Sequence, residues 1–98
     1  MALETTKWDV TEYLDSEEAI AAYIEAAFED GDPEMIKHAL GNVARARGMT
    51  SIAKDAGVTR EALYKALSEK GDPKLSTLLG VMKALGVRLS ATTAVPAE

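Results

Sequence analysis

The sequence predicts an all-α domain of five helices, with an N-terminal arm or helix before it and one short β-strand after it. Three observations predict this class. Apolar residues recur every three or four positions along nearly the whole chain, which is the spacing of a helix face. Glycines and prolines stand between these stretches and separate them into helix-sized pieces. The chain has 98 residues, 47% of them hydrophobic, which is enough for one core and too little for two.

The first helix is predicted from Asp15 to Glu29. Asp15 followed three residues later by Glu18 resembles a capping box, and Gly31 is placed to end the helix. Its apolar stripe consists of Ile20, Tyr23, Ile24, Ala27 and Phe28.

The second helix is predicted to begin at Asp32-Pro33 and to run to about Arg47, before Gly48. Asp32 suits the N-cap position, and proline is tolerated at the first helical position because its missing N–H has no partner there. The residues expected to be buried are Met35, Ile36, Ala39, Leu40 and Val43.

Three shorter helices should follow. One begins at Met49 or Thr50 and ends at Ala56, and after a Gly57-Val58 turn the next begins at the N-cap Thr59 and runs to about Ser68. After a loop at residues 71–73, the last helix begins at Ser76 or Thr77 and ends at Gly86. Its inward side is expected to carry Leu78, Leu79, Met82 and Leu85.

Residues 87–92 are predicted to form the strand, because apolar and polar residues alternate there. A lone strand needs a hydrogen-bonding partner, and the same strand of a second copy is the simplest one. We therefore expect a homodimer, formed by the last helix together with Val87, Leu89 and Ala91. The chain then divides into an N-terminal arm (1–14), one helical domain (15–91) and a flexible tail (92–98).

The composition excludes several classes of function. The chain has no cysteine and a single histidine, His38, which excludes disulfides, thiol catalysis and a multi-histidine metal site within one chain. Asp30, Asp32 and Glu34 lack the spacing of a calcium loop. We expect no cofactor, no metal and no enzyme activity. No apolar run reaches the roughly 18 residues of a membrane span, and no export signal is evident, so a cytoplasmic location is expected.

Charge is distributed unevenly along the chain, whose net charge is −5. Residues 1–32 contain ten acidic residues and one basic residue, a net charge of −9. Residues 33–75 contain eight basic and five acidic residues, a net charge of +3. Such a division suggests two partners of opposite charge, although both halves could simply be solvated helix faces.

Residues 49–67 contain the most informative motif, two short helices joined at Gly57. Ala53 is small where the helices must approach, and Gly57 stands where a side chain would clash or where a positive φ is needed. The inward residues are Ile52, Ala53, Ala56, Val58, Leu63, Ala66 and Leu67. The opposite face of the second helix displays Arg60, Glu61, Tyr64, Lys65 and Ser68, a polar surface of the kind that reads the major groove.

This segment resembles the helix-turn-helix of the lambda-repressor-like (Cro-repressor type) domains, through Ala53, Gly57, Val58, Thr59 and Arg60, with Leu63 in the recognition helix. The flanking segments resemble a narrower group, the addiction-module antidote proteins or HigA-like antitoxins. The matching stretches are Trp8-Asp9, Tyr13-Leu14 and residues 40–49, 60–67, 71–73 and 83–89, so that the resemblance covers roughly residues 7–91.

The resemblance implies an antitoxin that neutralises a small basic RelE-like toxin, a ribonuclease that cleaves mRNA, and that represses its own operon as a dimer on operator DNA. The acidic segment 1–32 could face the toxin, and the remainder could face the DNA. A glutamine often found at the start of the first motif helix is replaced here by Thr50-Ser51, whose hydroxyls can still bind phosphate.

Individual roles follow from this reading. Arg60 is the first choice for a base contact, with a surface ion pair as the alternative. Tyr64 could contact a sugar-phosphate or a thymine methyl, or pack on a neighbouring helix. Glu61 opposes phosphate and would have to read cytosine or stay out of contact. The predicted DNA contacts are Thr50, Ser51, Thr59, Arg60, Glu61, Tyr64, Lys65 and Lys70.

For the toxin, we expect contacts from Trp8, Tyr13, Glu17 and Glu18. Tryptophan is favoured at the centres of interfaces, although Trp8 could instead fasten the arm to the first helix. Two other functions compete with the antitoxin: a phage-type helix-turn-helix repressor without a toxin, and a protein-interaction module that has lost DNA binding. No nucleophile, base and orienting group stand together to support an enzyme.

Overall fold

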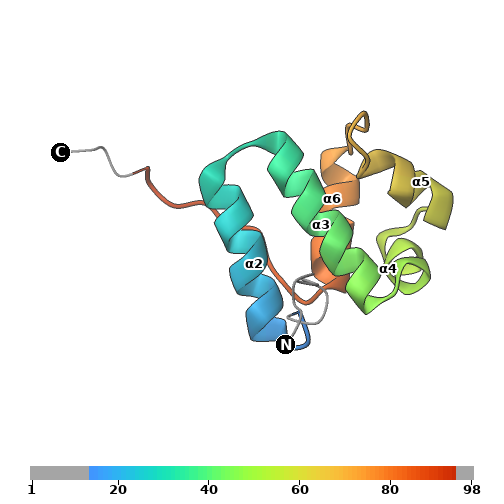
Figure 1. Cartoon of the computed structure of the whole chain (residues 1–98), viewed down its shortest axis with the longest axis horizontal. Helices are drawn as coiled ribbons and strands as arrows, with labels where there is room; N and C mark the ends of the chain where they lie inside the picture. The colour runs from blue at the N-terminus through green and yellow to red at the C-terminus, as the bar shows by residue number, and fades with distance from the viewer. Residues whose placement is uncertain (1–13, 95–98) are drawn as a thin grey trace, which may run out of the picture.

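A computed structural model of the chain describes residues 14–94, and within this range the chain forms five α-helices (Figure 1). The all-α class is therefore confirmed for the described residues. No helix among residues 14–94 is long and apolar enough to cross a membrane. The helices are α2 (Glu17–Asp30), α3 (Pro33–Arg47), α4 (Met49–Ala56), α5 (Arg60–Ala66) and α6 (Leu75–Ala84).

Side chains at the N-terminal ends of the helices explain where most of them begin. The Asp32 carboxylate accepts a 3.0 Å hydrogen bond from the backbone N–H of Glu34, with Pro33 in the first turn, as predicted. At α2 the N-cap is Ser16 rather than Asp15: the Ser16 hydroxyl accepts from the N–H of Ala19 at 3.1 Å. Aspartate and serine can both accept this N-cap hydrogen bond, but α2 begins after Ser16 and not after Asp15.

α2 and α3 lie side by side as an antiparallel pair, and α4 packs against α6 (Figure 1). A Cβ added to Gly80 on α6 would lie 3.1 Å from the Cα of Ala56, so a side chain at this position would require the two helices to move apart slightly. The largest fully buried side chains come from four of the five described helices or their ends: Ile20, Leu40, Val43, Leu63, Val81 and Leu85.

Two residues predicted to be buried are exposed instead. Met35 is 46% exposed and lines an open groove with Leu67 and Ser68 rather than entering the core. Leu79 is 44% exposed, and Val81 takes the buried position on α6. Helical spacing allows more than one apolar stripe on a helix as apolar as α6, and the contact with α4 selects which one is buried.

The predicted strand at residues 87–92 is not formed within residues 14–94. After Gly86 the chain is irregular through Ala94 and runs along α2 (Figure 1). A strand requires hydrogen bonds to a neighbouring extended backbone, and residues 88–94 form none with the rest of the described range 14–94. Pairing with a second copy therefore stays a prediction. Leu14, the last residue of the predicted arm, is buried at 2% exposure and belongs to the core.

Candidate nucleic-acid interface

The turn between α4 and α5 depends on the backbone conformation of Gly57. Its φ is +80°, in the left-handed region, and a Cβ built there meets nothing within 4 Å. Of the two reasons predicted for this glycine, the positive φ therefore applies and the steric clash does not. The Val58 N–H donates to the Ala53 carbonyl at 3.0 Å, which closes the end of α4 before the chain turns.

α5 begins at a side-chain cap and is anchored by its apolar face. The Thr59 hydroxyl accepts a 3.0 Å hydrogen bond from the N–H of Ala62, which confirms Thr59 as the N-cap. Leu63 is fully buried and Leu67 nearly so. This anchoring leaves the outer face of the helix exposed. All eight residues predicted to contact DNA are exposed: Thr50, Ser51, Thr59, Arg60, Glu61, Tyr64, Lys65 and Lys70.

Arg60 and Tyr64 form a pair on this outer face. The Arg60 guanidinium carbon lies 5.2 Å from the centroid of the Tyr64 ring, within the range of a cation–π contact. Tyr64 is 39% exposed. Within residues 14–94 no acidic residue forms an ion pair with Arg60. The guanidinium therefore keeps its hydrogen-bond donors available while the ring beneath restricts its position.

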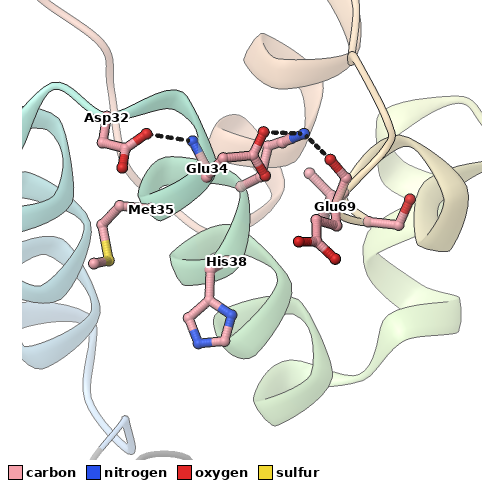
Figure 2. Close-up of a pocket in the computed structure, with 8 residues that line it drawn as sticks. Asp32, Glu34, Met35, His38 and Glu69 are labelled. Carbon is pink, nitrogen blue, oxygen red and sulfur yellow. Dashed lines mark hydrogen bonds and ion pairs between the residues drawn. The ribbon is translucent and has the colours of Figure 1, made fainter.

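A buried lysine holds the loop after α5 against α3. Lys37 is 8% exposed, and its Nζ donates hydrogen bonds to the carbonyls of Glu69 at 3.0 Å and Gly71 at 2.6 Å. The Glu34 carboxylate lies 3.1 Å from the same Nζ. Figure 2 shows Glu34 and Glu69 converging on this point from two different parts of the chain. We call this arrangement the Lys37 clamp.

The sequence interpretation counted Lys37 only among the eight basic residues of segment 33–75, assigned it no role, and so missed this contact. The available signal was position: Lys37 stands three residues before Leu40 and seven before Ala44, on the buried stripe of α3. Gly71 lies so close to the end of α5 that a Cβ there would be 2.1 Å from the Lys65 carbonyl oxygen. The loop thus passes directly over the last turn of α5.

Of the four residues predicted to contact a toxin, the structure describes two. Trp8 and Tyr13 lie outside the described residues. Glu17 and Glu18 are exposed in the first turn of α2. The Glu17 carboxylate lies near Gly86, where a Cβ would be 3.3 Å from its Oε2.

The residues predicted for the dimer lie on the segment after α6. Leu89 is 40% exposed and Ala91 is exposed, whereas Val87 is half-buried against the core. Two of the three are therefore accessible to a second chain.

Residues 14–94 contain no group of three metal-ligating side chains. His38 lines the groove of Figure 2 but points away from the carboxylates of Glu34 and Glu69. On α5, the structure brings the hydrogen-bond donors of Arg60 together with the Tyr64 ring on an exposed helix face, an arrangement suited to binding a ligand rather than a metal ion.

Comparison with known proteins gives one family match and one similar protein. A family model described as "Probable addiction module antidote protein" matches residues 4–93. A protein of Haemophilus influenzae, described as "Uncharacterized protein", is 47% identical over 88 residues, which cover 90% of this chain and 91% of the relative. No solved structure matches the chain. The chain therefore belongs to the family of addiction module antidote proteins, which are non-enzymatic regulators that act as antitoxins.

Proposed function

We propose that this antitoxin belongs to a type II toxin–antitoxin module, in which it neutralises a small basic RelE-like toxin that cleaves mRNA. We further propose that it binds operator DNA through a lambda-repressor-like helix-turn-helix formed by α4 and α5, and so represses its own operon. The observation that carries the DNA-binding proposal is the Arg60–Tyr64 pair on the exposed face of an anchored helix.

The geometry of α5 supports a reading role in the major groove. Its buried face is fixed by Leu63, so its outer face can be presented to bases as a rigid surface. Arg60 stands in the first turn, where arginine can donate two hydrogen bonds to guanine. Tyr64 beneath it restricts the guanidinium and reduces the entropy lost on binding. Lys65 and Lys70 are exposed and would contact the phosphate backbone.

The start of α4 and the cap of α5 support phosphate contacts. The hydroxyls of Thr50 and Ser51 are exposed in the first turn of α4. Hydroxyl groups and backbone N–H groups at helix starts are common phosphate donors, and they position a protein on DNA without reading its sequence. Glu61 is exposed on the same face and would either accept from cytosine or remain outside the contact.

Homodimerisation is part of the proposal, because helix-turn-helix repressors read two half-sites with two copies. Two leucines one turn apart on α6, Leu75 and Leu79, are 62% and 44% exposed. Leu89, on the segment after α6, is 40% exposed as well. A second copy that covers these exposed leucines would bring two α5 helices into one assembly.

The test is binding to DNA taken from upstream of the protein's own operon, measured by fluorescence anisotropy against a scrambled duplex. We expect tighter binding to the native fragment, weakening steeply between about 50 and about 300 mM salt, since each neutralised phosphate releases counterions. Equal affinity for both duplexes, or none for either, would overturn the repressor function and leave the antitoxin function to be tested with the toxin.

A further inference from the structure

A groove of about 550 Å³ lies between α2 and the irregular segment that follows α6. One wall is formed by α2, through Ala21, Glu25, Phe28 and Glu29. The other wall is formed by the segment after α6, which runs along α2 (Figure 1) and contributes Gly86, Val87, Arg88, Leu89, Ser90 and Thr92. The groove lies apart from α4 and α5, so DNA binding does not account for it.

The charge of α2 is entirely of one sign. The helix contains five acidic residues and no basic residue. Two of the acids, Glu25 and Glu29, are exposed, line the groove and stand one turn apart, where like charges repel. Within residues 14–94 neither of them forms an ion pair.

The helix also places acids where its own dipole disfavours them. Glu29 and Asp30 occupy the last turn of α2, at the negative end of the helix dipole, and no basic residue compensates them there. Local stability alone would favour lysine or arginine at these positions. Arg88 on the opposite wall of the groove carries one positive charge, so the charged residues that line the groove, Glu25, Glu29 and Arg88, leave it net negative, and a cationic partner would balance the remainder.

The floor of the groove is apolar. Ile24 and Met82 are buried beneath it, and Phe28 is half-buried in its wall. Leu89 is 40% exposed on the opposite wall. An occupant therefore needs apolar side chains for the floor and positive charges for the rim formed by Glu25 and Glu29.

We propose that this groove is the docking site for a basic amphipathic segment of the toxin. The inference rests on the proposed pairing with a basic toxin and assigns its binding surface. A second copy of this chain fits the rim poorly, because it has a net charge of −5 and its own α2 is wholly acidic. Charge complementarity with Glu25 and Glu29 would accelerate the encounter, and burial of Phe28 and of the apolar floor would hold the complex together.

The experiment uses the full chain and, as probe, the protein encoded by the gene adjacent to its own, with affinity measured by isothermal titration calorimetry. The test variants are E25K/E29K, which reverses the rim charge, and A21W, which fills the groove at an exposed position without changing charge. The control is D55K/D72K, which changes the net charge equally at exposed positions outside the groove.

We expect both test variants to lose at least about tenfold in affinity and the control to keep most of it. We also expect E25K/E29K to melt at the same or a higher temperature than the unaltered chain, since it removes an unfavourable like-charge pair. Loss of binding without loss of stability would support a docking surface rather than a structural role.

Two results would overturn the proposal in distinguishable ways. If the unaltered chain binds the probe and E25K/E29K binds it as tightly as the control does, the groove is not the docking site, while the toxin pairing stands. If the unaltered chain does not bind the probe, the pairing itself fails, and the groove loses its occupant. Dissociation of a dimer by E25K/E29K would assign the groove to a second copy and overturn the toxin assignment.

Discussion

The ammonium group of Lys37 on α3 donates a 2.6 Å hydrogen bond to the backbone carbonyl of Gly71, 34 positions later in the chain. With the second bond to the Glu69 carbonyl, it fixes the loop that follows α5. This lysine therefore helps to set the orientation of the proposed recognition helix without facing the DNA. Its charge is balanced by Glu34 and by two carbonyl dipoles rather than by solvent.

Replacing Lys37 with methionine should lower the free energy of unfolding by about 2 kcal/mol or more, because two part-buried hydrogen bonds from a charged donor are lost. Urea denaturation followed by circular dichroism measures the loss. The matched control is K83M, at an exposed lysine of α6, for which we expect a change within about 0.5 kcal/mol. Equal stability of the two variants would contradict the clamp.

Removing only the carboxylate of the clamp should have a smaller effect. Glu34 has a side chain that is 58% exposed, and an ion pair at such a position contributes about 0–1 kcal/mol. We therefore expect E34Q to be clearly more stable than K37M in the same denaturation experiment. A loss in E34Q as large as that in K37M would mean that the ion pair, and not the carbonyl contacts, provides the stability.

Replacing Arg60 with alanine should weaken binding to the native operator fragment by about 1–3 kcal/mol and leave binding to a scrambled duplex much less affected. K83A removes a positive charge elsewhere and controls for net charge. Anisotropy titrations at one fixed salt concentration give both affinities. If R60A reduces both affinities equally, Arg60 contacts phosphate and does not read bases.

Gly57 and Gly71 should respond differently to asparagine. Gly57 needs a positive φ but has open space, and asparagine tolerates that conformation, so G57N should lose about 1 kcal/mol or less. Gly71 has no free space, because any Cβ would meet the Lys65 and Ala66 carbonyls at 2.1 and 2.4 Å. We expect G71N to lose well over 1 kcal/mol and to melt at a lower temperature than G57N; the reverse order would be inconsistent with the structure.

Replacing Leu89 with aspartate tests the proposed dimer. This exposed leucine lies on the segment predicted to pair with a second copy, and a charge there would be buried on pairing. Sedimentation should show a dimer for the unaltered chain and a monomer for L89D, with weaker operator binding by the variant. A monomer before any substitution would remove residues 87–92 from the dimer proposal.

Deleting residues 1–13 tests whether the N-terminal arm contacts the toxin, and the deletion must spare Leu14. Leu14 is 2% exposed in the core, so a deletion that includes it removes buried apolar contacts and lowers stability by about 2–5 kcal/mol, as other large core truncations do. We expect a chain lacking residues 1–13 to keep its DNA affinity and to bind the toxin less tightly. Full neutralisation of the toxin by that chain would exclude Trp8 and Tyr13 as contacts.

The sequence by itself determined the helices, their order and the outer face of the proposed DNA-binding motif. The Asp32 and Thr59 caps, the left-handed Gly57 and the exposure of Arg60 follow from neighbours within about one helical turn, so local chemistry suffices to predict them. Errors among these local features were small. Ser16 caps α2 in place of Asp15, and α5 ends at Ala66 rather than near Ser68.

Only the tertiary structure decided which residues met across the chain. Lys37 is buried against a loop 34 positions later in the chain. On α6, Val81 is buried and Leu79 is exposed. Residues 87–92 lie beside α2 without a strand partner among the described residues. The physical reason is that these outcomes depend on how helices dock. Helices pack where their backbones can approach closely, as α6 does at Gly80 against Ala56 of α4, and where the packing buries one of several possible apolar stripes. Both conditions depend on residues far apart in the chain, so they cannot be predicted from a single turn of helix.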